Sequence, residues 1–600
     1  MCGIAGEFRF DGVAPRRARL EKMVAKLARR GPDGEGLHLD GPVALGHRRL
    51  AIIDLSERSR QPMLDTALGL ALVFNGTIYN YPQLRAELIG KGHTFHSDGD
   101  TEVILRAYAE WGEASVARLH GAFAFALWDA RSQTLLLARD RLGIKPLYFS
   151  QDAGSIRFAS TPQALLAGSD TENPIDTNID PIALHHHFTL HAVVPAPRTL
   201  MTGIRKVPPA TTMLIDLQGR NQACQYWQLD ARRPEQPLTE AQWTEAIHAA
   251  LRDAVKKRLL IADVKVGVLL SGGLDSSLLV ALLAEQGVDD LMTFSVGFED
   301  HPEERGNEFE YSDAVAERYA TRHHQFHIPN NQVLARLPEA GGQMAEPMVG
   351  QDAVAFYLLS EQVARSVKVV QSGQGADEVF GGYYWYPRMQ AETEGTPLER
   401  FRRHYFDRDH AEYLQMIAPA NHGPDYTADT LAARLAEPNA DSFLDQVLRT
   451  DTTMLITDDP VKRVDNMTMA WGLEARVPFL DHELVELAAR MPPELKLASG
   501  GKHILKRIAR GLVPDAVIDR KKGYFPMPAL KYVRGEFLDF MADILNSQAC
   551  RNRGLYQRAY VEKLLAAPEQ HHTRIQGSKL WHLALLEFWL QMHIDQAGNA

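Results

Sequence analysis

The second residue of the chain is a cysteine, so removal of Met1 would leave Cys2 with a free α-amine beside its thiol. An α-amine has a pKa of about 7.7–8.0 and is therefore partly a neutral base at neutral pH. Held against the thiol, directly or through a water molecule, it can accept the thiol proton and so activate an N-terminal nucleophile. The alternative is that a small residue at position 2 serves only the removal of methionine.

A glycine-bearing loop with the sequence SGGLDSS spans residues 271–277, between a buried-type apolar run and an apolar helical pattern. Small residues let the backbone approach phosphate oxygens closely, and the N-terminus of a following helix favours negative charge. The chain has no GxxxxGKS/T sequence, so this loop is not a Walker A motif. Asp275 is the expected Mg²⁺ ligand, because carboxylate oxygen suits a hard cation that bridges phosphates. The alternative is a turn that only caps a helix.

Two different patterns of elements must position these groups. The first pattern, in residues 2–228, consists of short strands and a few helices and predicts a layered α+β domain. Its expected elements are helices at 18–28 and 101–111, a strand at 71–74 ending in an Asn75-Gly76 turn, and a strand pair at 121–129 and 134–139. A polar stretch at 229–240 is the expected linker.

The second pattern, in residues 241–600, alternates strand and helix and predicts a doubly wound parallel sheet. The expected strands are 264–270, 291–297 and 368–371, and the expected helices are 244–260, 278–286 and 311–319. The rest of the chain is expected to be largely helical and to end in a packed helix at 579–592, which is rich in Leu and Trp.

Composition excludes several classes of protein. The chain has 600 residues, of which 45% are hydrophobic and 24% charged, as in ordinary globular proteins. The net charge of −11 provides no overall field for nucleic acid or an anionic membrane, and no apolar run is long enough to span a bilayer. Three cysteines and an N-terminus unlike a signal peptide predict a reducing, cytoplasmic location. We expect Cys224 and Cys550 to be packing residues.

Five segments of the first half, in this order, resemble the glutaminase domain of class II glutamine amidotransferases of the asparagine synthetase kind. They are RGPDG at 30–34, GHRRL at 46–50, NGTIYN at 75–80, DTE at 100–102 and ARDRLGIKPLY at 138–148. The resemblance implies an N-terminal nucleophile fold, an αββα sandwich, in which the Cys2 thiolate attacks the side-chain amide of glutamine.

The resemblance also implies the roles of the neighbouring residues. Arg49 would bind the glutamine carboxylate, as a guanidinium can with two parallel hydrogen bonds. The Asn75 side chain and the Gly76 backbone N–H would form the oxyanion hole, and Asp100 would bind the glutamine α-ammonium. This chain has Thr77 where the family commonly has glutamate, which leaves glutamine anchored by one contact fewer or by a different arrangement.

Four segments of the second half resemble the synthetase domain of the same family, which cleaves ATP to AMP and pyrophosphate. They are SGGLDSS, SGQGADEVFGGY at 372–383, LEARVPFLD at 473–481 and GKHILKR at 501–507. The implied ATP and pyrophosphate contacts are Ser271, Gly272, Gly273, Asp275, Ser276, Ser295, Gly297, Ser372 and Gly373. The implied acceptor contacts are Gln374, Asp377 and Glu378, with Asp275 and Asp377 as Mg²⁺ ligands. Lys502 would stabilise the charge of the departing pyrophosphate.

Two acceptor carboxylates are compatible with the sequence. Aspartate is the family's usual acceptor, but Gln374 replaces the glutamate usual in the second loop. Segments such as VVPAPRTL, EPMVGQDAVAFYLLS and VDNMTMAWGLEARVPFLD resemble one subgroup, the N-acetylglutaminylglutamine amidotransferases, which make a compatible solute. We therefore expect an acetylated dipeptide, with aspartate as the alternative. A scaffold on a decayed fold, and a cyclising relative that uses no ammonia, are disfavoured by the intact glutaminase residues.

Other features have simpler interpretations. The histidines at 185–187 and at 323, 324 and 327 lack the paired cysteine or carboxylate spacing of a zinc site, so we expect no metal there. The aromatic run YYWY at 383–386 fits either an acceptor pocket or core packing. The sequence leaves a monomer and a homodimer open.

Overall fold

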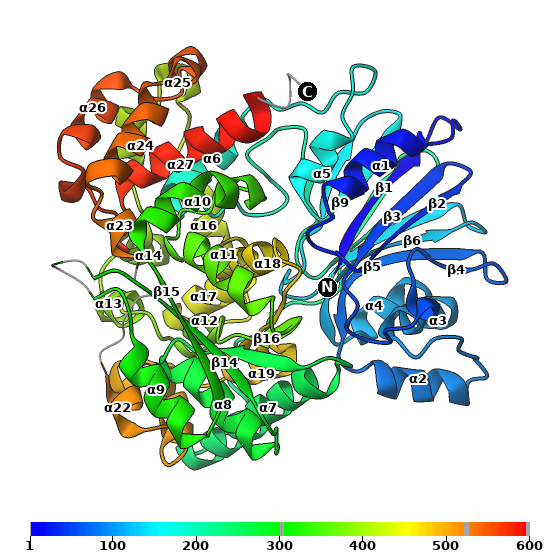
Figure 1. The fold of residues 1–600 in the computed structure, drawn as a ribbon, viewed down its shortest axis with the longest axis horizontal. Helices are drawn as coiled ribbons and strands as arrows, with labels where there is room; N and C mark the ends of the chain where they lie inside the picture. The colour runs from blue at the N-terminus through cyan, green and yellow to red at the C-terminus, as the bar shows by residue number, and fades with distance from the viewer. Residues whose placement is uncertain (1, 301, 303–304, 521–526, 596–600) are drawn as a thin grey trace.

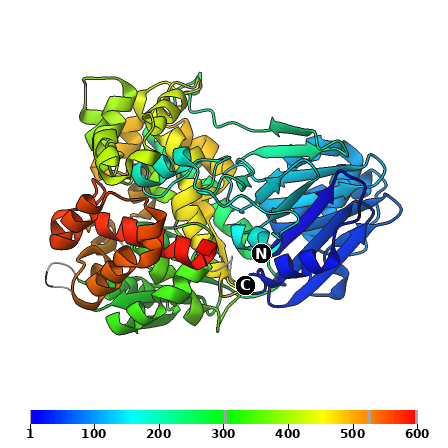
Figure 2. The same cartoon turned by 90° about the horizontal axis from the view of Figure 1, so that it is seen from above.

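The chain folds into two parts that lie side by side, as the computed structural model shows (Figure 1). The structure describes residues 2–595 except 301, 303–304 and 521–526. The N-terminal part, blue to cyan, consists mainly of antiparallel sheets, and the C-terminal part is built on a parallel sheet with many helices. Figure 2 shows the same two parts from above, again next to each other.

Two antiparallel sheets form the middle of the N-terminal part. The first sheet has the order β10 (Arg205–Lys206), β8 (Tyr148–Gln151), β9 (Ser155–Ala159), β1 (Gly3–Arg9), β3 (Val43–Arg49) and β2 (Gly34–Asp40). The second has the order β12 (Asn221–Gln225), β11 (Thr211–Ile215), β7 (Thr134–Arg139), β6 (Gly121–Asp129), β5 (Leu70–Ile78) and β4 (Met63–Asp65). Their inner faces pack together through buried residues such as Phe8, Val73 and Ala126.

Helices cover the outer faces of both sheets. Helices α1 (Arg17–Ala25) and α5 (Pro162–Ala167) lie on the first sheet, and α2 (Tyr81–Gly90) and α3 (Asp100–Trp111) lie on the second. Each helix buries an apolar stripe, and a buried leucine or valine contributes about 1.5–3 kcal/mol. The predicted αββα sandwich is therefore confirmed, and the predicted helices at 18–28 and 101–111 are α1 and α3 to within a few residues.

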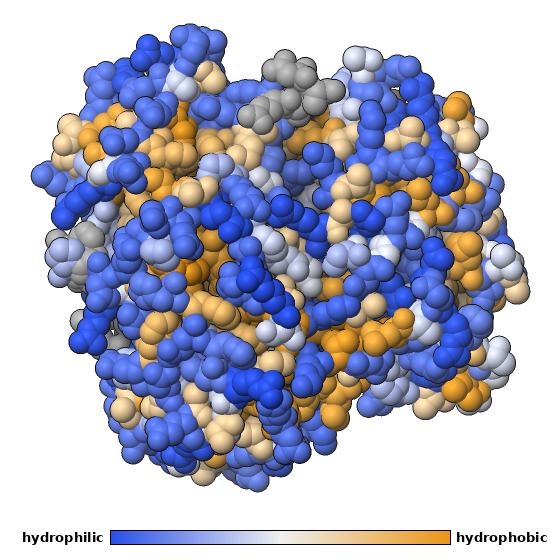
Figure 3. Space-filling view, in the orientation of Figure 1, coloured by the Kyte–Doolittle hydropathy of each residue, from blue (hydrophilic) through white to orange (hydrophobic). Residues whose placement is uncertain are grey.

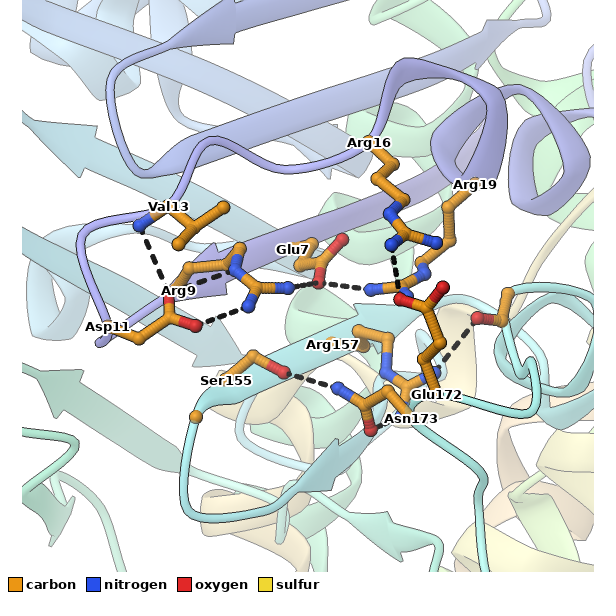
Figure 4. Close-up of polar contacts among 12 residues, drawn as sticks. Glu7, Arg9, Asp11, Val13, Arg16, Arg19, Ser155, Arg157, Glu172 and Asn173 are labelled. Carbon is orange, nitrogen blue, oxygen red and sulfur yellow. Dashed lines mark hydrogen bonds and ion pairs between the residues drawn. The ribbon is translucent and has the colours of Figure 1, made fainter.

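A cluster of charged side chains fixes α1 to the first sheet (Figure 4). The Arg19 guanidinium of α1 lies 2.6 Å from the Glu7 carboxylate of β1, and the two side chains are only 4% and 2% exposed. Breaking a buried ion pair is costly because one charge stays in a medium that cannot solvate it.

We expect Arg19→Ala to lower the free energy of unfolding by about 3 kcal/mol, near the lower end for buried pairs. The lower end applies because Arg9 stays 3.6 Å from Glu7. Arg17→Ala is the control: its contact with Glu21 is exposed, so its removal should cost less than about 0.5 kcal/mol. Urea denaturation followed by fluorescence measures both, and equal effects would contradict the ranking.

The predicted turn at Asn75-Gly76 is wrong, because both residues lie inside β5, which pairs with β6 from Leu70 to Ile78. The glycine serves close packing instead. A Cβ at Gly76 would lie 2.3 Å from the carbonyl oxygen of Ala122 on β6, so only a residue without a side chain lets the two backbones approach here.

The C-terminal part contains a five-stranded parallel sheet in the order β15 (Arg322–Ile328), β14 (Met292–Phe298), β13 (Val266–Leu269), β16 (Val369–Gln371) and β17 (Glu474–Arg476). The chain runs outward from β13 to β15 and then returns to β16 on the other side of β13. The predicted doubly wound sheet is confirmed. In such sheets ligands bind beyond the carboxyl ends of the strands where this order reverses, so the segments after β13 and β16 must meet.

Helices flank this sheet and build the remainder of the chain. Those near the sheet are α7 (Glu240–Leu260), α8 (Leu274–Glu285), α9 (Phe309–Arg318) and α11 (Asp352–Val363). Farther along are α12 (Ala376–Phe380), α16 (Tyr426–Leu435), α18 (Lys462–Met469), α21 (His503–Ala509), α24 (Gly535–Asn546) and α27 (Lys579–Leu590). Helix α8 begins within the predicted loop, so Asp275, Ser276 and Ser277 belong to its first turns.

Among the described residues, no helix is long and apolar enough to cross a bilayer. Hydrophilic side chains cover most of the face drawn in Figure 3, and hydrophobic ones form smaller patches between them.

Cys550 is buried as predicted, but Cys224 is exposed on the edge strand β12, so the prediction that Cys224 is a packing residue was wrong. The predicted terminal helix is α27, whose Trp581 and Trp589 are buried.

Candidate functional site

Cys2 lies just before β1 and faces Asn75 on β5, across the interface between the two sheets. Its backbone nitrogen donates to the Asn75 Oδ1 atom at 2.9 Å, and its carbonyl oxygen accepts from Arg30 Nε at 3.2 Å. Cys2 is 7% exposed and its thiol is free. Met1, whose removal is predicted, lies outside the described residues. The fold thus fixes the backbone of Cys2 on both sides.

The surroundings of the thiol keep it protonated, so a reaction at Cys2 must begin with removal of the thiol proton. Burial raises the pKa of the Cys2 thiol, whereas the backbone N–H of Leu50 and the Arg49 guanidinium lower it. The Asn75 Nδ2 atom is buried and has no hydrogen-bond partner among the described residues. A buried donor without a partner costs about 1–3 kcal/mol, so this amide is suited to an acceptor that only a bound substrate brings.

Of the other residues predicted for glutamine, Arg49 lies near enough to act electrostatically on this thiol, and Asp100 lies against β5. Arg49 ends β3, and its guanidinium donates to the Ser56 carbonyl at 2.9 Å and to the Asp54 carbonyl. Asp100 begins α3 and accepts a hydrogen bond from the Ile78 backbone nitrogen at 3.0 Å. Burial raises the pKa of the Asp100 carboxyl to about 6, so a cation placed beside it would be bound favourably.

Sequence reasoning missed one residue of this region, Glu474 on β17. Its carboxylate accepts a hydrogen bond from the Thr77 hydroxyl at 3.3 Å, although the two residues are 397 positions apart in the chain. Burial acts against its charge, but Arg476 helps to hold the pKa of Glu474 below its usual value. A glutamate inside an apolar motif such as LEARVPFLD was the available signal, since buried acids are rare unless paired.

A cavity of about 630 Å³ lies beyond the carboxyl ends of β13 and β16. Ten of the predicted nucleotide and acceptor residues line it: Ser271, Gly273, Asp275, Ser276, Ser295, Ser372, Gly373, Gln374, Asp377 and Lys502. Gly272, Gly297 and Glu378 are not among its lining residues. The aromatic run is divided, because Tyr383 and Trp385 line the cavity whereas Tyr386 is fully buried in the core.

Glycines explain how the two loops come so close. A Cβ at Gly373 would lie 3.0 Å from the Asp275 Cβ, and one at Gly382 would lie 2.2 Å from the Lys502 Cε. Gly272 and Gly297 have a different role, because a Cβ on either would clash with α9 or the segment just before it. These two glycines therefore position the loop and the strand without facing the cavity.

Lys502 joins the two loops at the cavity. Its Nζ atom lies 2.6 Å from Asp275 Oδ2 and 2.8 Å from Asp377 Oδ1. Burial works against its charge, but these two carboxylates raise the pKa of Lys502 above its usual value. The pair of carboxylates converges on one cation, and an all-oxygen donor set of this kind fits Mg²⁺.

Glu378 lies behind the wall of the cavity. It is 2% exposed and accepts a hydrogen bond from the Tyr383 hydroxyl at 2.8 Å. Burial, with the charges of Asp451 and Asp377, raises the pKa of Glu378 to about 8. This hydrogen bond holds the side chain of Tyr383, which lines the cavity.

One of the histidines for which no metal site was expected, His185, has a carboxylate neighbour in the fold that is distant in the sequence. His185 lies with His410 and Asp425, and their ligand atoms are all within 4.8 Å of one another. Burial lowers the pKa of His185 to about 4, and its Nε2 atom lies 3.1 Å from His410 Nδ1. His323, His324 and His327 lie on β15.

Comparison with known proteins identifies the family of the chain. Residues 246–591 match the asparagine synthase family and residues 1–227 match the glutamine amidotransferase domain. The chain is 30% identical to the glutamine-hydrolyzing asparagine synthetase 1 of Bacillus subtilis, covering 99% of this chain and 97% of that protein. It is 30% identical to asparagine synthetase B of Escherichia coli, covering 88% and 82%. The chain therefore belongs to the asparagine synthase family of amidotransferase enzymes.

Proposed function

We propose that this enzyme transfers ammonia from glutamine to an acceptor carboxylate, with cleavage of ATP to AMP and pyrophosphate. Residues 2–228 would form the glutaminase domain, 229–240 the linker and 241–600 the synthetase domain. The observation that carries the proposal is the presence of two built sites in one chain: the buried Cys2–Asn75 pair and the Asp275–Lys502–Asp377 cluster. Free cysteines are consistent with a cytoplasmic location, which we also propose.

In the glutaminase site, the α-amine of Cys2 takes the thiol proton, and the thiolate adds to the side-chain carbonyl carbon of glutamine. Asn75 Nδ2 and the Gly76 N–H donate to the oxyanion. The α-ammonium of Cys2 returns the thiol proton to the amide nitrogen, the carbon–nitrogen bond breaks, and ammonia leaves. Water then hydrolyses the thioester to glutamate and frees the thiol. Arg49 and Asp100 would hold the carboxylate and the ammonium of glutamine, respectively.

In the synthetase site, the acceptor carboxylate attacks the α-phosphorus of ATP, and pyrophosphate leaves. Ammonia then adds to the acyl carbon, and AMP leaves to give the amide. The backbone of the loop at Ser271–Gly273 and the first turn of α8 would bind phosphate oxygens. Asp275 and Asp377 would hold Mg²⁺, which neutralises phosphate charge when bound. Lys502 would stabilise the charge on the departing pyrophosphate.

For the acceptor, we propose N-acetylglutaminylglutamine. An acetylated dipeptide has no ammonium group, whereas aspartate has one that needs an anionic partner. Gln374 lines the cavity where a glutamate would supply such a charge. Two carboxylates of the cavity wall, Asp352 and Asp459, are already paired with Arg463, the first at 3.0 Å, and so already have a cationic partner. The named relatives favour the alternative acceptor, aspartate, which would make the enzyme an asparagine synthetase.

A direct assay separates the two acceptors. Purified enzyme is given ATP and glutamine with either N-acetylglutaminylglutamine or aspartate, and AMP and pyrophosphate are followed. We expect acceptor-dependent turnover with the dipeptide. Strong turnover with aspartate and none with the dipeptide would overturn the acceptor proposal while leaving the amidotransferase function in place.

We also expect Gln374→Glu to shift the preference toward aspartate. A new carboxylate on the cavity wall would attract the aspartate ammonium, and a hydrogen bond to a charged group contributes about 1.5–3 kcal/mol. The ratio of kcat/KM for aspartate to that for the dipeptide should rise by about 10-fold or more. The KM for ATP serves as the internal control, and an unchanged ratio would contradict the role of Gln374.

A further inference from the structure

Two buried carboxylates from different domains are held by consecutive residues of β5. Asp100 of α3 accepts from the Ile78 backbone nitrogen at 3.0 Å, and Glu474 of β17 accepts from the Thr77 hydroxyl at 3.3 Å. Asp100 is 5% exposed and Glu474 is 2% exposed. The charge of Glu474 contributes to the raised pKa of both Asp100 and the Cys2 thiol. The carboxylate of Glu474 therefore belongs electrostatically to the glutaminase site.

The strand geometry explains how Glu474 reaches this site. Side chains two apart on a strand point to the same face, so Thr77 lies on the face from which Asn75 contacts Cys2. Thr77 is buried and carries no charge, and its hydroxyl is directed at Glu474. The position where this chain lacks an acidic side chain is thus occupied by an acid from the synthetase domain.

The two carboxylates also act on each other. Glu474 is paired with Arg476, whose Nε donates to it at 2.5 Å, while Arg476 Nη1 donates to the carbonyls of Arg258 and Ile261. Burial raises the pKa of Asp100 to about 6, and the nearby charge of Glu474 adds to that rise. A cation bound beside both carboxylates would offset this repulsion. Glutamine carries one cationic group, its α-ammonium.

We infer that Glu474 acts with Asp100 to bind the α-ammonium of glutamine, so that the synthetase domain completes the glutaminase site. The inference rests on the proposed hydrolysis of glutamine at Cys2 and is independent of the acceptor. It also connects the two sites, because the carbonyl of Arg476, two residues after Glu474, accepts from the Ser372 nitrogen of the cavity loop at 2.8 Å. Glutamine binding would then depend on the position of β17 in the sheet.

The test compares glutamine with glutaramic acid, which has hydrogen in place of the α-amino group. For each variant, ammonia release gives the ratio of kcat/KM for glutamine to that for glutaramic acid. We expect Glu474→Gln to reduce this preference by about 10–100-fold, the equivalent of one charged hydrogen bond. The KM for glutamine should rise more than kcat falls. If Glu474 had only a structural role, the substitution would change kcat/KM for both substrates by the same factor.

A second variant tests the same point from the other domain. Adding Thr77→Glu to Glu474→Gln returns a carboxylate to the site from β5, so at least part of the preference for glutamine should be regained. Thr457→Val is the matched control, because the Thr457 hydroxyl also joins the two domains, through the Leu142 carbonyl at 3.0 Å, away from Thr77. Its preference should stay within about twofold of that of the parent.

The outcomes separate the inference from the proposed function. An unchanged preference in Glu474→Gln, or its loss without any recovery in the double variant, would overturn the role of Glu474. If Glu474→Gln does not fold, Glu474→Asp keeps the charge beside Arg476 but shortens the reach, and the preference should still fall, by about 10-fold; an unchanged preference would overturn the inference. A parent enzyme that releases no ammonia from glutamine would refute the glutaminase proposal itself.

Discussion

Cys2→Ala should lower glutamine-dependent synthesis by about 10³-fold or more, because the proposed thioester forms on the Cys2 thiol. Synthesis from added ammonia should persist, because we propose that this reaction uses only the cavity beyond β13 and β16. The buried thiol has a raised pKa, so the nucleophile depends on a local base, which we propose to be its own α-amine. Amide formation is measured with glutamine and with ammonium chloride as the nitrogen source.

Two comparisons make this result specific. Cys224→Ala changes an exposed cysteine on β12 and should leave both activities unchanged. N-terminal mass should show that Met1 is absent from the active enzyme, since a retained methionine would block the α-amine. Glutamine-dependent synthesis that persists in Cys2→Ala would refute the assignment of the nucleophile.

Much of the architecture could be predicted because it depends on local patterns. The apolar runs of β13, β14 and β16 and the helices between them indicated the doubly wound sheet, and the order of its strands brings the two glycine-bearing segments together. Strands β15 and β17 were not predicted. The first is a polar edge strand, RHHQFHI, and the second has only three residues, so neither has the continuous apolar run that marks a central strand.

The parts of the site that escaped prediction depend on contacts between distant residues. Thr77 was recognised as a departure from the family pattern, but its partner Glu474 is 397 positions away. Gly76 looked like a turn residue because an Asn-Gly pair usually is one, whereas here it is required by the close approach of β6. Local sequence reports the conformations a residue prefers, and only the fold shows which neighbour selects among them.

Lys502→Ala should reduce synthesis with both glutamine and ammonia by about 10²–10³-fold, the usual cost of removing a group that stabilises developing charge. Lys502 is the buried cation between Asp275 and Asp377. Its removal would leave two neighbouring carboxylates to repel the phosphates of ATP. Because those carboxylates raise its pKa, Lys502 stays protonated at neutral and moderately alkaline pH, and its own titration should not limit activity there.

The glutaminase reaction distinguishes this effect from general damage. In the proposed mechanism ammonia is released from glutamine at Cys2, in the other proposed domain, so Lys502→Ala should still hydrolyse glutamine but no longer couple it to amide formation. Lys506→Ala is the matched control: Lys506 also lines the cavity but donates to the Ser499 carbonyl, and its removal should cost much less. If Lys502→Ala lost glutamine hydrolysis and synthesis in parallel, Lys502 would be maintaining the structure of both domains, and its assignment to pyrophosphate departure would fail.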